Sequence, residues 1–247
     1  MRYRATLAYD GTAYQGFQRQ GDKPTIQGAV ERALAAVTGQ KASVTGAGRT
    51  DSGVHAAGQV IAFEVDWRRG ETALLRAINA NLPDDIALQS LTSAPPGFHP
   101  RFDARARCYR YDVIQAEQRQ PLLLHRAWRV REPLDGERLR QAAALLVGEY
   151  DFGAFGTPPK GENTVRRVYR SEWTAQPAEW GTLWTYRIEA NAFLYRMVRR
   201  IVGALVTVGR GWWSVETFEA VFRRAELPAV KVIAPPQGLT LEAVRYK

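Results

Sequence analysis

Apolar and polar residues alternate with two distinct periodicities along this chain of 247 residues. Residues 2–9 alternate strictly, which predicts a strand with one buried face. Residues 26–37 carry apolar side chains at helical spacing, between Thr25 as a suitable N-cap and Gly39 as a suitable terminator. This second segment is the clearest helix of the sequence.

Both periodicities continue along the rest of the chain. Further strands are expected at residues 43–48, 59–65, 86–90, 108–113, 168–174, 182–190 and 239–245. Further helices are expected at residues 72–79, 139–146, 194–208 and 215–223. This mixture predicts an α/β or α+β fold. Because the order of elements is similar in outline in two parts of the chain, we expect an N-terminal half, residues 1–104, and a C-terminal half, residues 105–247.

The composition is that of a folded protein. Hydrophobic residues make up 45% of the chain, which is enough to bury a core. The apolar stretches are short and interrupted by Arg, and the N-terminus lacks the apolar centre of a signal peptide, so we expect no membrane association. The single cysteine, Cys108, excludes an internal disulfide. A cytoplasmic protein is the simplest interpretation.

The charge favours a polyanionic partner. Lys and Arg number 34 against 25 Asp and Glu, which gives a net charge of +9. Almost all of the excess is Arg, whose planar guanidinium suits contacts with phosphates and bases. A GC-rich genome also enriches Arg, so the charge is compatible with nucleic-acid binding without establishing it.

Several common chemistries find no support. The three histidines are well separated and show no zinc-ligand spacing, and no Gly-Lys-Ser/Thr tripeptide forms a P-loop. The third glycine of a dinucleotide fingerprint is replaced by Asp51, and Ser52 lacks the flanking glycines of a nucleophile elbow. We therefore expect neither a metal nor a small-molecule cofactor.

The segment 46–56 is the strongest candidate for chemistry. It reads Gly-Ala-Gly-Arg-Thr-Asp-Ser-Gly-Val-His-Ala, so a cation, a carboxylate and an imidazole lie within a glycine-rich frame. Glycines permit unusual backbone angles and close approach by a ligand. One interpretation is a tight hairpin in which Asp51 caps a turn. The other is a site for nucleic-acid chemistry on a basic protein.

This segment resembles the signature of the tRNA pseudouridine synthase A family, with Asp51 at the place of the catalytic aspartate. The resemblance extends over nearly the whole chain, in the expected order, through Tyr9-Asp10-Gly11-Thr12, Asn81-Leu82-Pro83, Phe98-His99, Arg107-x-Tyr109-Arg110-Tyr111, Asn191-Ala192-Phe193-Leu194, Met197-Val198-Arg199 and Gly238-Leu239-Thr240-Leu241. It implies an enzyme that isomerises uridine to pseudouridine in the anticodon stem-loop of tRNA, at positions 38, 39 and 40. Asp51 would act as a nucleophile or as a base.

The resemblance also implies roles for four further residues. Tyr109 would stack on the extruded uracil or shuttle its C5 proton, and an ordinary core tyrosine is the alternative. Arg199 would pair with Asp51 and keep it ionised. Arg49 would contact the flipped nucleotide or a neighbouring phosphate. Leu241 would form a wall of the uracil pocket, unless it is only a core leucine.

Arg199 is also unusual on the residues alone. On the expected helix 194–208 and its N-terminal extension, its same-face neighbours would be Tyr195, Ala192, Val202 and Gly203, which are mostly apolar or small. An arginine on such a face is costly without a carboxylate or phosphate partner. An arginine that extends from a core helix to the solvent is the alternative.

By resemblance, the fold is α+β: the pseudouridine synthase fold, in which two ferredoxin-like halves form a mainly antiparallel sheet with a central cleft. Asp51 lies in the N-terminal half, and the C-terminal half would complete the active site. The family implies a homodimer that binds tRNA. Two alternatives stay open: a pseudouridine synthase for another RNA, such as rRNA or the T arm, and a non-catalytic RNA-binding protein.

Overall fold

The computed structural model describes residues 1–158, 161–226, 230 and 232–247. The chain forms two compact units, one of Met1–Arg105 with Thr240–Lys247 and one of Ala106–Leu239. The N-terminal segment thus ends one residue later than the expected half, and the C-terminal segment belongs with it. The reason is strand pairing: β10 (Leu239–Arg245) pairs in parallel with β3 (His55–Glu64) through Thr240↔His55 and Leu241↔Ala56.

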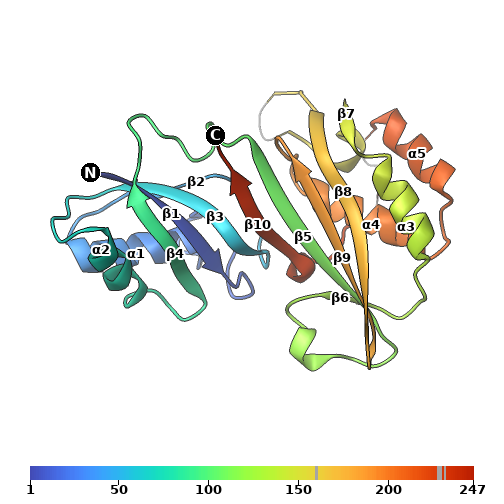
Figure 1. Cartoon of the computed structure of the whole chain (residues 1–247), viewed down its shortest axis with the longest axis horizontal. Helices are drawn as coiled ribbons and strands as arrows, with labels where there is room; N and C mark the ends of the chain where they lie inside the picture. The colour runs from blue at the N-terminus through green and yellow to red at the C-terminus, as the bar shows by residue number, and fades with distance from the viewer. Residues whose placement is uncertain (159–160, 227–229, 231) are drawn as a thin grey trace. The chain divides into compact units, whose positions relative to one another are not determined.

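The first unit is built on a mainly antiparallel sheet with the strand order β4-β1-β3-β10, in which β2 also pairs with β3. Its other elements are β1 (Arg2–Tyr9), α1 (Ile26–Thr38), β2 (Thr45–Gly46), α2 (Glu71–Asn79) and β4 (Ile86–Ser93). The chain order β1-α1-β2-β3-α2-β4 combined with the spatial order β4-β1-β3-β2 is the ferredoxin-like arrangement that the resemblance implies. Helices α1 and α2 lie beside each other (Figure 1).

Helix α1 forms where the hydrophobic pattern predicts it. The Thr25 hydroxyl accepts a hydrogen bond from Gly28 N at 3.3 Å. At the other end, Gly39 adopts a left-handed φ of 69° and donates from its N–H to Ala35 O at 2.9 Å. Both caps satisfy backbone groups that the helix itself cannot. Ile26, Val30 and Leu34 of this helix are buried.

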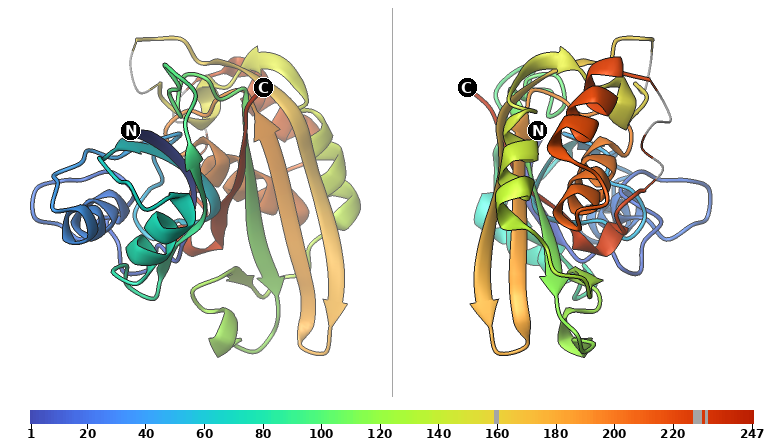
Figure 2. Two further views of the ribbon diagram at one scale, coloured as in Figure 1. Left: turned by 60° about the vertical axis from the view of Figure 1, so that its left-hand side comes forward. Right: turned by 90° about the vertical axis from the view of Figure 1, so that its right-hand side faces the viewer.

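The second unit contains the sheet β5-β9-β8-β7, with the short strand β6 parallel to β5. Its elements are β5 (Ala106–Gln115), β6 (Trp128–Val130), α3 (Gly136–Ala144), β7 (Gly148–Asp151), β8 (Val165–Ala178), β9 (Gly181–Ala190), α4 (Met197–Gly209) and α5 (Val215–Arg224). The helices lie on one face of this sheet (Figure 2). Antiparallel sheets flanked by helices in both units confirm the α+β class. The central cleft stays a prediction.

Two elements of the first unit differ most from the expected ones. The strand expected over residues 43–48 is reduced to β2, because the chain bends after Gly46 and only Ala47 N still donates to Val60 O, at 2.8 Å. Strand β3 begins at His55, four residues earlier than expected, because Thr240 and Leu241 pair with its first residues. Both differences come from contacts between segments far apart in the sequence.

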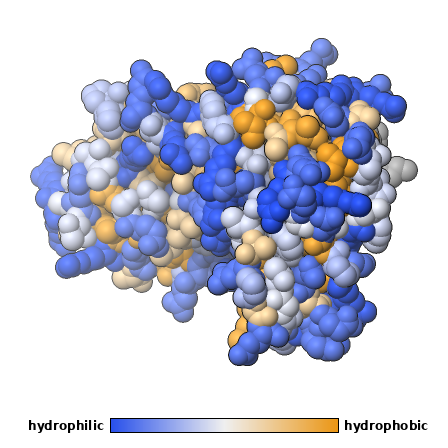
Figure 3. Space-filling view, turned by 45° about the vertical axis from the view of Figure 1, so that its right-hand side comes forward, coloured by the Kyte–Doolittle hydropathy of each residue, from blue (hydrophilic) through white to orange (hydrophobic). Residues whose placement is uncertain are grey.

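Figure 3 shows a largely hydrophilic face with a limited hydrophobic area at its upper right. Among the described residues, no helix is long and apolar enough to cross a membrane. The largest side chains that are fully buried are aromatic, with Tyr111, Tyr186 and Phe63 first among them.

Candidate active site

Asp51 lies in the loop between β2 and β3 of the first unit, at the first position of a tight turn. The Asp51 carbonyl accepts a hydrogen bond from Val54 N at 3.2 Å, and Gly53 at the third position has a φ of 76°. A positive φ at this position is typical of a type II turn and favours glycine. Asp51 itself is partly exposed, whereas Thr50 before it and Val54 after it are buried.

A second loop, residues 10–24, packs along both sides of this turn. Its Tyr14 carbonyl accepts from the Ser52 hydroxyl at 3.1 Å and from Gly53 N at 3.3 Å. Its Phe17 N donates to Thr50 O at 3.1 Å. The residues on either side of Asp51 are therefore tied to one partner loop through backbone groups.

Two glycines make this close approach possible. A Cβ at Gly16, which has a φ of 88°, would come within 2.7 Å of Thr50 O. A Cβ at Gly11 would come within 2.0 Å of Val54 O. Real Cβ atoms do not approach a backbone oxygen this closely, so any other residue at Gly11 or Gly16 would push the Asp51 loop away.

Side chains complete the attachment of the Asp51 loop. The hydroxyls of Tyr9 and Thr50 hydrogen-bond at 2.8 Å in the buried interior. His55, only 3% exposed, brings Nδ1 within 3.1 Å of Gly11 N and 3.0 Å of Asp10 Oδ1. A single ring nitrogen cannot accept from the amide and donate to the carboxylate at once, so Nδ1 makes one of these two bonds at a time.

Tyr14 is anchored at its other end by an acid. Its hydroxyl donates to Asp85 Oδ1 at 2.6 Å, while Asp10 N donates to Asp85 O at 2.9 Å. Burial, followed by the bond to Asp85, raises the pKa of Tyr14 above its ordinary value. The tyrosine therefore stays protonated and keeps its backbone carbonyl positioned for Ser52 and Gly53.

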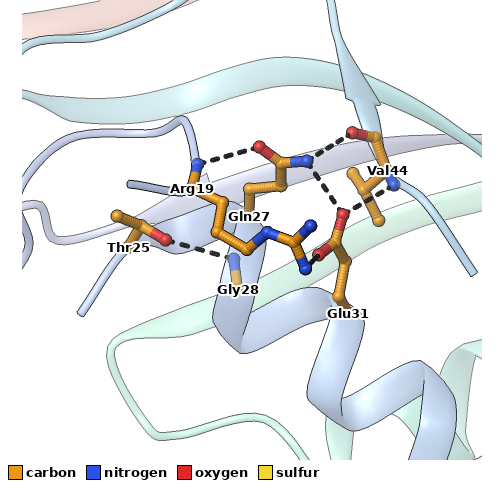
Figure 4. A network of polar contacts seen from close by, with 6 residues as sticks. All are labelled: Arg19, Thr25, Gln27, Gly28, Glu31 and Val44. Atoms are coloured by element: carbon orange, nitrogen blue, oxygen red, sulfur yellow. Dashed lines mark hydrogen bonds and ion pairs between the residues drawn. The ribbon is translucent and has the colours of Figure 1, made fainter. Parts of the chain in front are cut away.

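Side chains of helix α1 bind the 10–24 loop and the segment that precedes β2 (Figure 4). Gln27 Oε1 accepts from Arg19 N at 2.9 Å, and its Nε2 donates to Glu31 Oε1 at 2.8 Å and to Val44 O at 3.1 Å. Glu31 Oε1 also accepts from Val44 N at 3.0 Å. One helix thus holds the end of the 10–24 loop and the segment that leads into β2.

The second unit contains Tyr109 and Arg199. Tyr109 lies on β5, is 8% exposed and packs edge-to-face on Phe193, with ring centroids 5.0 Å apart. Its strand neighbour Tyr111 donates its hydroxyl to Pro235 O at 2.7 Å. Burial raises the pKa of Tyr111 well above its ordinary value, and the positive charge of Arg199 opposes this shift in part. Tyr109, Tyr111 and Val113 of β5 are all buried.

Arg199 lies in the first turn of α4, and its expected surroundings need a correction. The helix begins at Met197, because Arg196 adopts a left-handed φ of 59°, so Tyr195 and Ala192 are not helical neighbours of Arg199. Arg199 Nε donates to Ala234 O at 2.8 Å, and Ala234 N donates back to Arg199 O at 3.0 Å. This reciprocal pair fixes the guanidinium on the side of α4 that faces residues 234–235. Its pairing with Asp51 stays a prediction.

The remaining predicted site residues lie in the first unit. Arg49 is exposed, two positions before Asp51. Leu241 is fully buried on β10, where it pairs with Ala56 of β3. Full burial suits a core leucine as well as a pocket wall, so both interpretations of Leu241 remain.

Sequence reasoning assigned no role to Tyr9, Thr50, Tyr14 and Gly16, although these residues hold the Asp51 loop. A signal was present for Tyr9, because it belongs to the Tyr9-Asp10-Gly11-Thr12 motif of the family resemblance. His55 contributes to the same attachment through its contact with Gly11 N. Within the part of the chain that the structure describes, no group of three or more acidic, His or Cys side chains could hold a metal ion.

Comparisons with known proteins identify the family of the chain. The profile of a family described as tRNA pseudouridine synthase matches residues 5–103 and 142–247. Asp51, Arg49, Arg199 and Leu241 fall inside the matched segments, whereas Tyr109 lies between them.

Similar proteins from several bacteria cover almost the whole chain. "tRNA pseudouridine synthase A" of Neisseria gonorrhoeae is 44% identical over 248 residues, which span 99% of this chain and 92% of that protein. The protein of the same name from Pseudothermotoga lettingae is 39% identical over 99% of both chains. The one from Methylacidiphilum infernorum is 40% identical over 99% of this chain and 95% of that protein. A chain of a Cbf5–Nop10–Gar1 complex is similar only weakly, with a TM-score of 0.35, 11% identity and coverage of 83% of this chain and 54% of that chain.

Proposed function

This chain belongs to the tRNA pseudouridine synthase family, and on that premise we propose that it isomerises uridine to pseudouridine in the anticodon stem-loop of tRNA, at positions 38 to 40. The N1–C1′ glycosidic bond breaks, the uracil rotates, and a C5–C1′ bond forms. The proton lost from C5 is balanced by the proton gained at N1. The reaction is therefore an isomerisation that needs no oxidant, reductant or second substrate.

Asp51 is the proposed catalytic carboxylate. It can attack C1′ or the base as a nucleophile, or it can act as a base that triggers loss of uracil. The observation that carries this proposal is the attachment of its neighbours: Thr50 is bonded to Phe17 and Tyr9, and Ser52 and Gly53 are bonded to Tyr14. A backbone held on both sides presents a partly exposed carboxylate in one geometry, which lowers the entropic cost of reaching the transition state.

Four residues are proposed to support the reaction. Arg199 would hold Asp51 ionised, Tyr109 would stack on the uracil, Arg49 would contact the flipped nucleotide, and Leu241 would wall the pocket. The fixed orientation of the Arg199 guanidinium by Ala234 O supports a positioning role. The edge-to-face contact of Tyr109 with Phe193 supports a rigid aromatic surface for a base.

The proposal extends to assembly and location. We expect a cytoplasmic homodimer, which sedimentation equilibrium would report as a mass near twice that of one 27.7 kDa chain. A monomer that is fully active on tRNA would contradict the dimer.

The activity is tested by mapping pseudouridine in an unmodified tRNA after incubation with the purified protein. The expected result is modification confined to positions 38 to 40. The alternative substrate would be supported if the protein modified only another RNA, and if deletion of its gene removed pseudouridine from the same sites of that RNA in the cell. Tight tRNA binding without any pseudouridine would support a non-catalytic RNA-binding protein.

A further inference from the structure

Residues 98–103 of the first unit form a tightly bonded loop that the proposed chemistry does not use. His99 Nδ1 accepts from Arg101 N at 3.2 Å and from Phe102 N at 3.3 Å. Asp103 closes the loop, because its carboxylate accepts from His99 N at 2.8 Å and its own N–H donates to His99 O at 3.1 Å. The loop is therefore held in one conformation by its own side chains.

Side chains from both ends of the chain also hold this loop. Arg2 Nε donates to Phe98 O at 2.9 Å, and the Tyr246 hydroxyl donates to Pro100 O at 2.7 Å. Phe98 is only 7% exposed and packs on the Tyr246 ring, with centroids 5.3 Å apart. A loop that is held both by its own hydrogen bonds and by bonds to Arg2 and Tyr246 has little conformational entropy left to lose when a ligand binds.

This rigid loop presents Phe102 to the solvent. The ring is 75% exposed, although the His99 ring packs on it with centroids 4.3 Å apart and planes inclined by 33°. The Arg101 guanidinium lies 5.8 Å from the centre of the same ring. The packing of the His99 ring orients this exposed side chain, so the Phe102 ring is not free to collapse onto the surface.

The surroundings are strongly basic. Arg101 and Arg105 belong to this stretch of chain, and Arg2, Arg4 and Arg245 contact it or its anchors. The acidic neighbours of these arginines include Asp103 within the loop and Glu64, which pairs with Arg2 at 2.6 Å. An aromatic ring within a basic field is the combination by which proteins bind single-stranded nucleic acid, since bases stack and phosphates pair with arginine.

We infer that Phe102, with His99 behind it and Arg101 beside it, is a stacking platform for an unpaired base of the substrate RNA. This inference rests on the proposed function, because it supplies the RNA, but it assigns a contact outside the Asp51 loop. A base would stack on the open face of Phe102, and Arg101 would contact the adjoining phosphate. The platform therefore contributes binding rather than chemistry.

The test measures equilibrium binding of unmodified tRNA to variants of the full chain over a range of salt concentrations. Removal of one stacked base typically costs about 5- to 150-fold in affinity, so Phe102→Ala should lose that much. Phe102→Tyr, which keeps the ring, should stay within about twofold of the wild type, and Phe102→Leu, which keeps the apolar bulk, should not. Leu122→Ala removes a side chain that is 95% exposed in the second unit and serves as the surface control, with no change expected.

Salt separates stacking from phosphate contact. Phe102→Ala should lower the affinity equally at all salt concentrations, whereas Arg101→Ala should reduce the slope of log K against log salt by about 1. Thermal unfolding of each variant checks that the loop substitution leaves the fold intact. An aromatic platform is indicated if Phe102→Leu loses as much affinity for tRNA as Phe102→Ala, while Phe102→Tyr keeps the affinity of the wild type.

Three results would overturn the inference. They are unchanged affinity of Phe102→Ala, equal losses for Phe102→Ala and Leu122→Ala, and a changed oligomeric state with normal RNA binding, which would make the loop a protein interface. The outcome is distinguishable from that of the proposed function. If the wild type makes pseudouridine and Phe102→Ala binds tRNA normally, only the platform is refuted. If Phe102→Ala loses affinity for tRNA but the wild type makes no pseudouridine, only the proposed activity is refuted.

Discussion

The close packing of the 10–24 loop on the Asp51 loop leads to a prediction that separates two physical effects. Gly16 combines a φ of 88° with a Cβ position 2.7 Å from Thr50 O. Gly11 has a Cβ position only 2.0 Å from Val54 O, without a positive φ. Gly21 has a φ of 52° and nothing within 4 Å, so it provides the matched control for backbone conformation alone. The three alanine variants therefore isolate conformational strain, steric displacement and their combination.

The expected magnitudes follow from these distances. Alanine in the left-handed region costs roughly 1–2 kcal/mol, so Gly21→Ala should lower the free energy of unfolding by about that amount and leave activity unchanged. In Gly16→Ala, the Thr50 carbonyl must retreat by about 0.7 Å to restore the 3.4 Å of ordinary contact, which adds roughly 1–3 kcal/mol of overpacking. In Gly11→Ala, the Val54 carbonyl must move about 1.4 Å by the same measure.

Activity is the decisive readout, because Asp51 lies between Thr50 and Val54. A displacement near 1 Å costs on the order of 10²-fold in rate, so we expect losses of this order for Gly11→Ala and Gly16→Ala. Single-turnover tritium release from C5-labelled tRNA, measured well below the unfolding temperature, reports the rate of the folded enzyme. Wild-type rates in both variants, or an equal loss in Gly21→Ala, would refute the idea that this contact positions the catalytic loop.

Three further predictions rest on other features. Glu31→Ala removes the acceptor of Val44 N and one of the two acceptors of Gln27 Nε2, and should lower the free energy of unfolding in urea by about 1–3 kcal/mol. Glu31→Gln keeps an acceptor oxygen and should cost less, and equal losses in the two variants would contradict the network. Burial raises the pKa of Tyr186, so the folded state keeps this proton after the unfolded state has lost it, and the free energy of unfolding should fall as the pH rises above about 10. In Tyr186→Phe the fall of the free energy of unfolding with pH should be shallower by about 1.4 kcal/mol per pH unit, and an unchanged slope would contradict this prediction. Affinity for tRNA should drop by roughly 10³–10⁵ between ~50 and ~200 mM salt if ~6–10 phosphates are contacted, and a flat dependence would exclude an extended RNA contact.

Local patterns in the sequence were sufficient where local physics decides the structure. Helix α1 begins and ends at its predicted caps, because Thr25 and Gly39 satisfy backbone groups within a few residues. Strand β9 was recognisable because its residues alternate between buried and half-buried from Trp184 onward. The start of α4 was missed because a non-glycine residue, Arg196, takes a left-handed conformation, and hydrophobic periodicity carries no information about that.

The candidate site shows the same limit more clearly. Asp51 could be recognised from its glycine-rich frame and its resemblance to a family signature. The contacts that hold it could not, because Gly16 and Thr50 are 34 positions apart and nothing local indicates that they touch. The short strands β6 and β7 were missed for a similar reason, since each is defined by its pairing with a longer strand.

The most direct test of the central claim is tritium release from C5-labelled uridine in tRNA, with wild type compared with Asp51→Asn, which keeps the size of the side chain and removes its charge. We predict release by the wild type and a loss of at least ~10³-fold in the variant, with tRNA binding retained. Release that survives the substitution would contradict the assignment of Asp51 as the catalytic carboxylate.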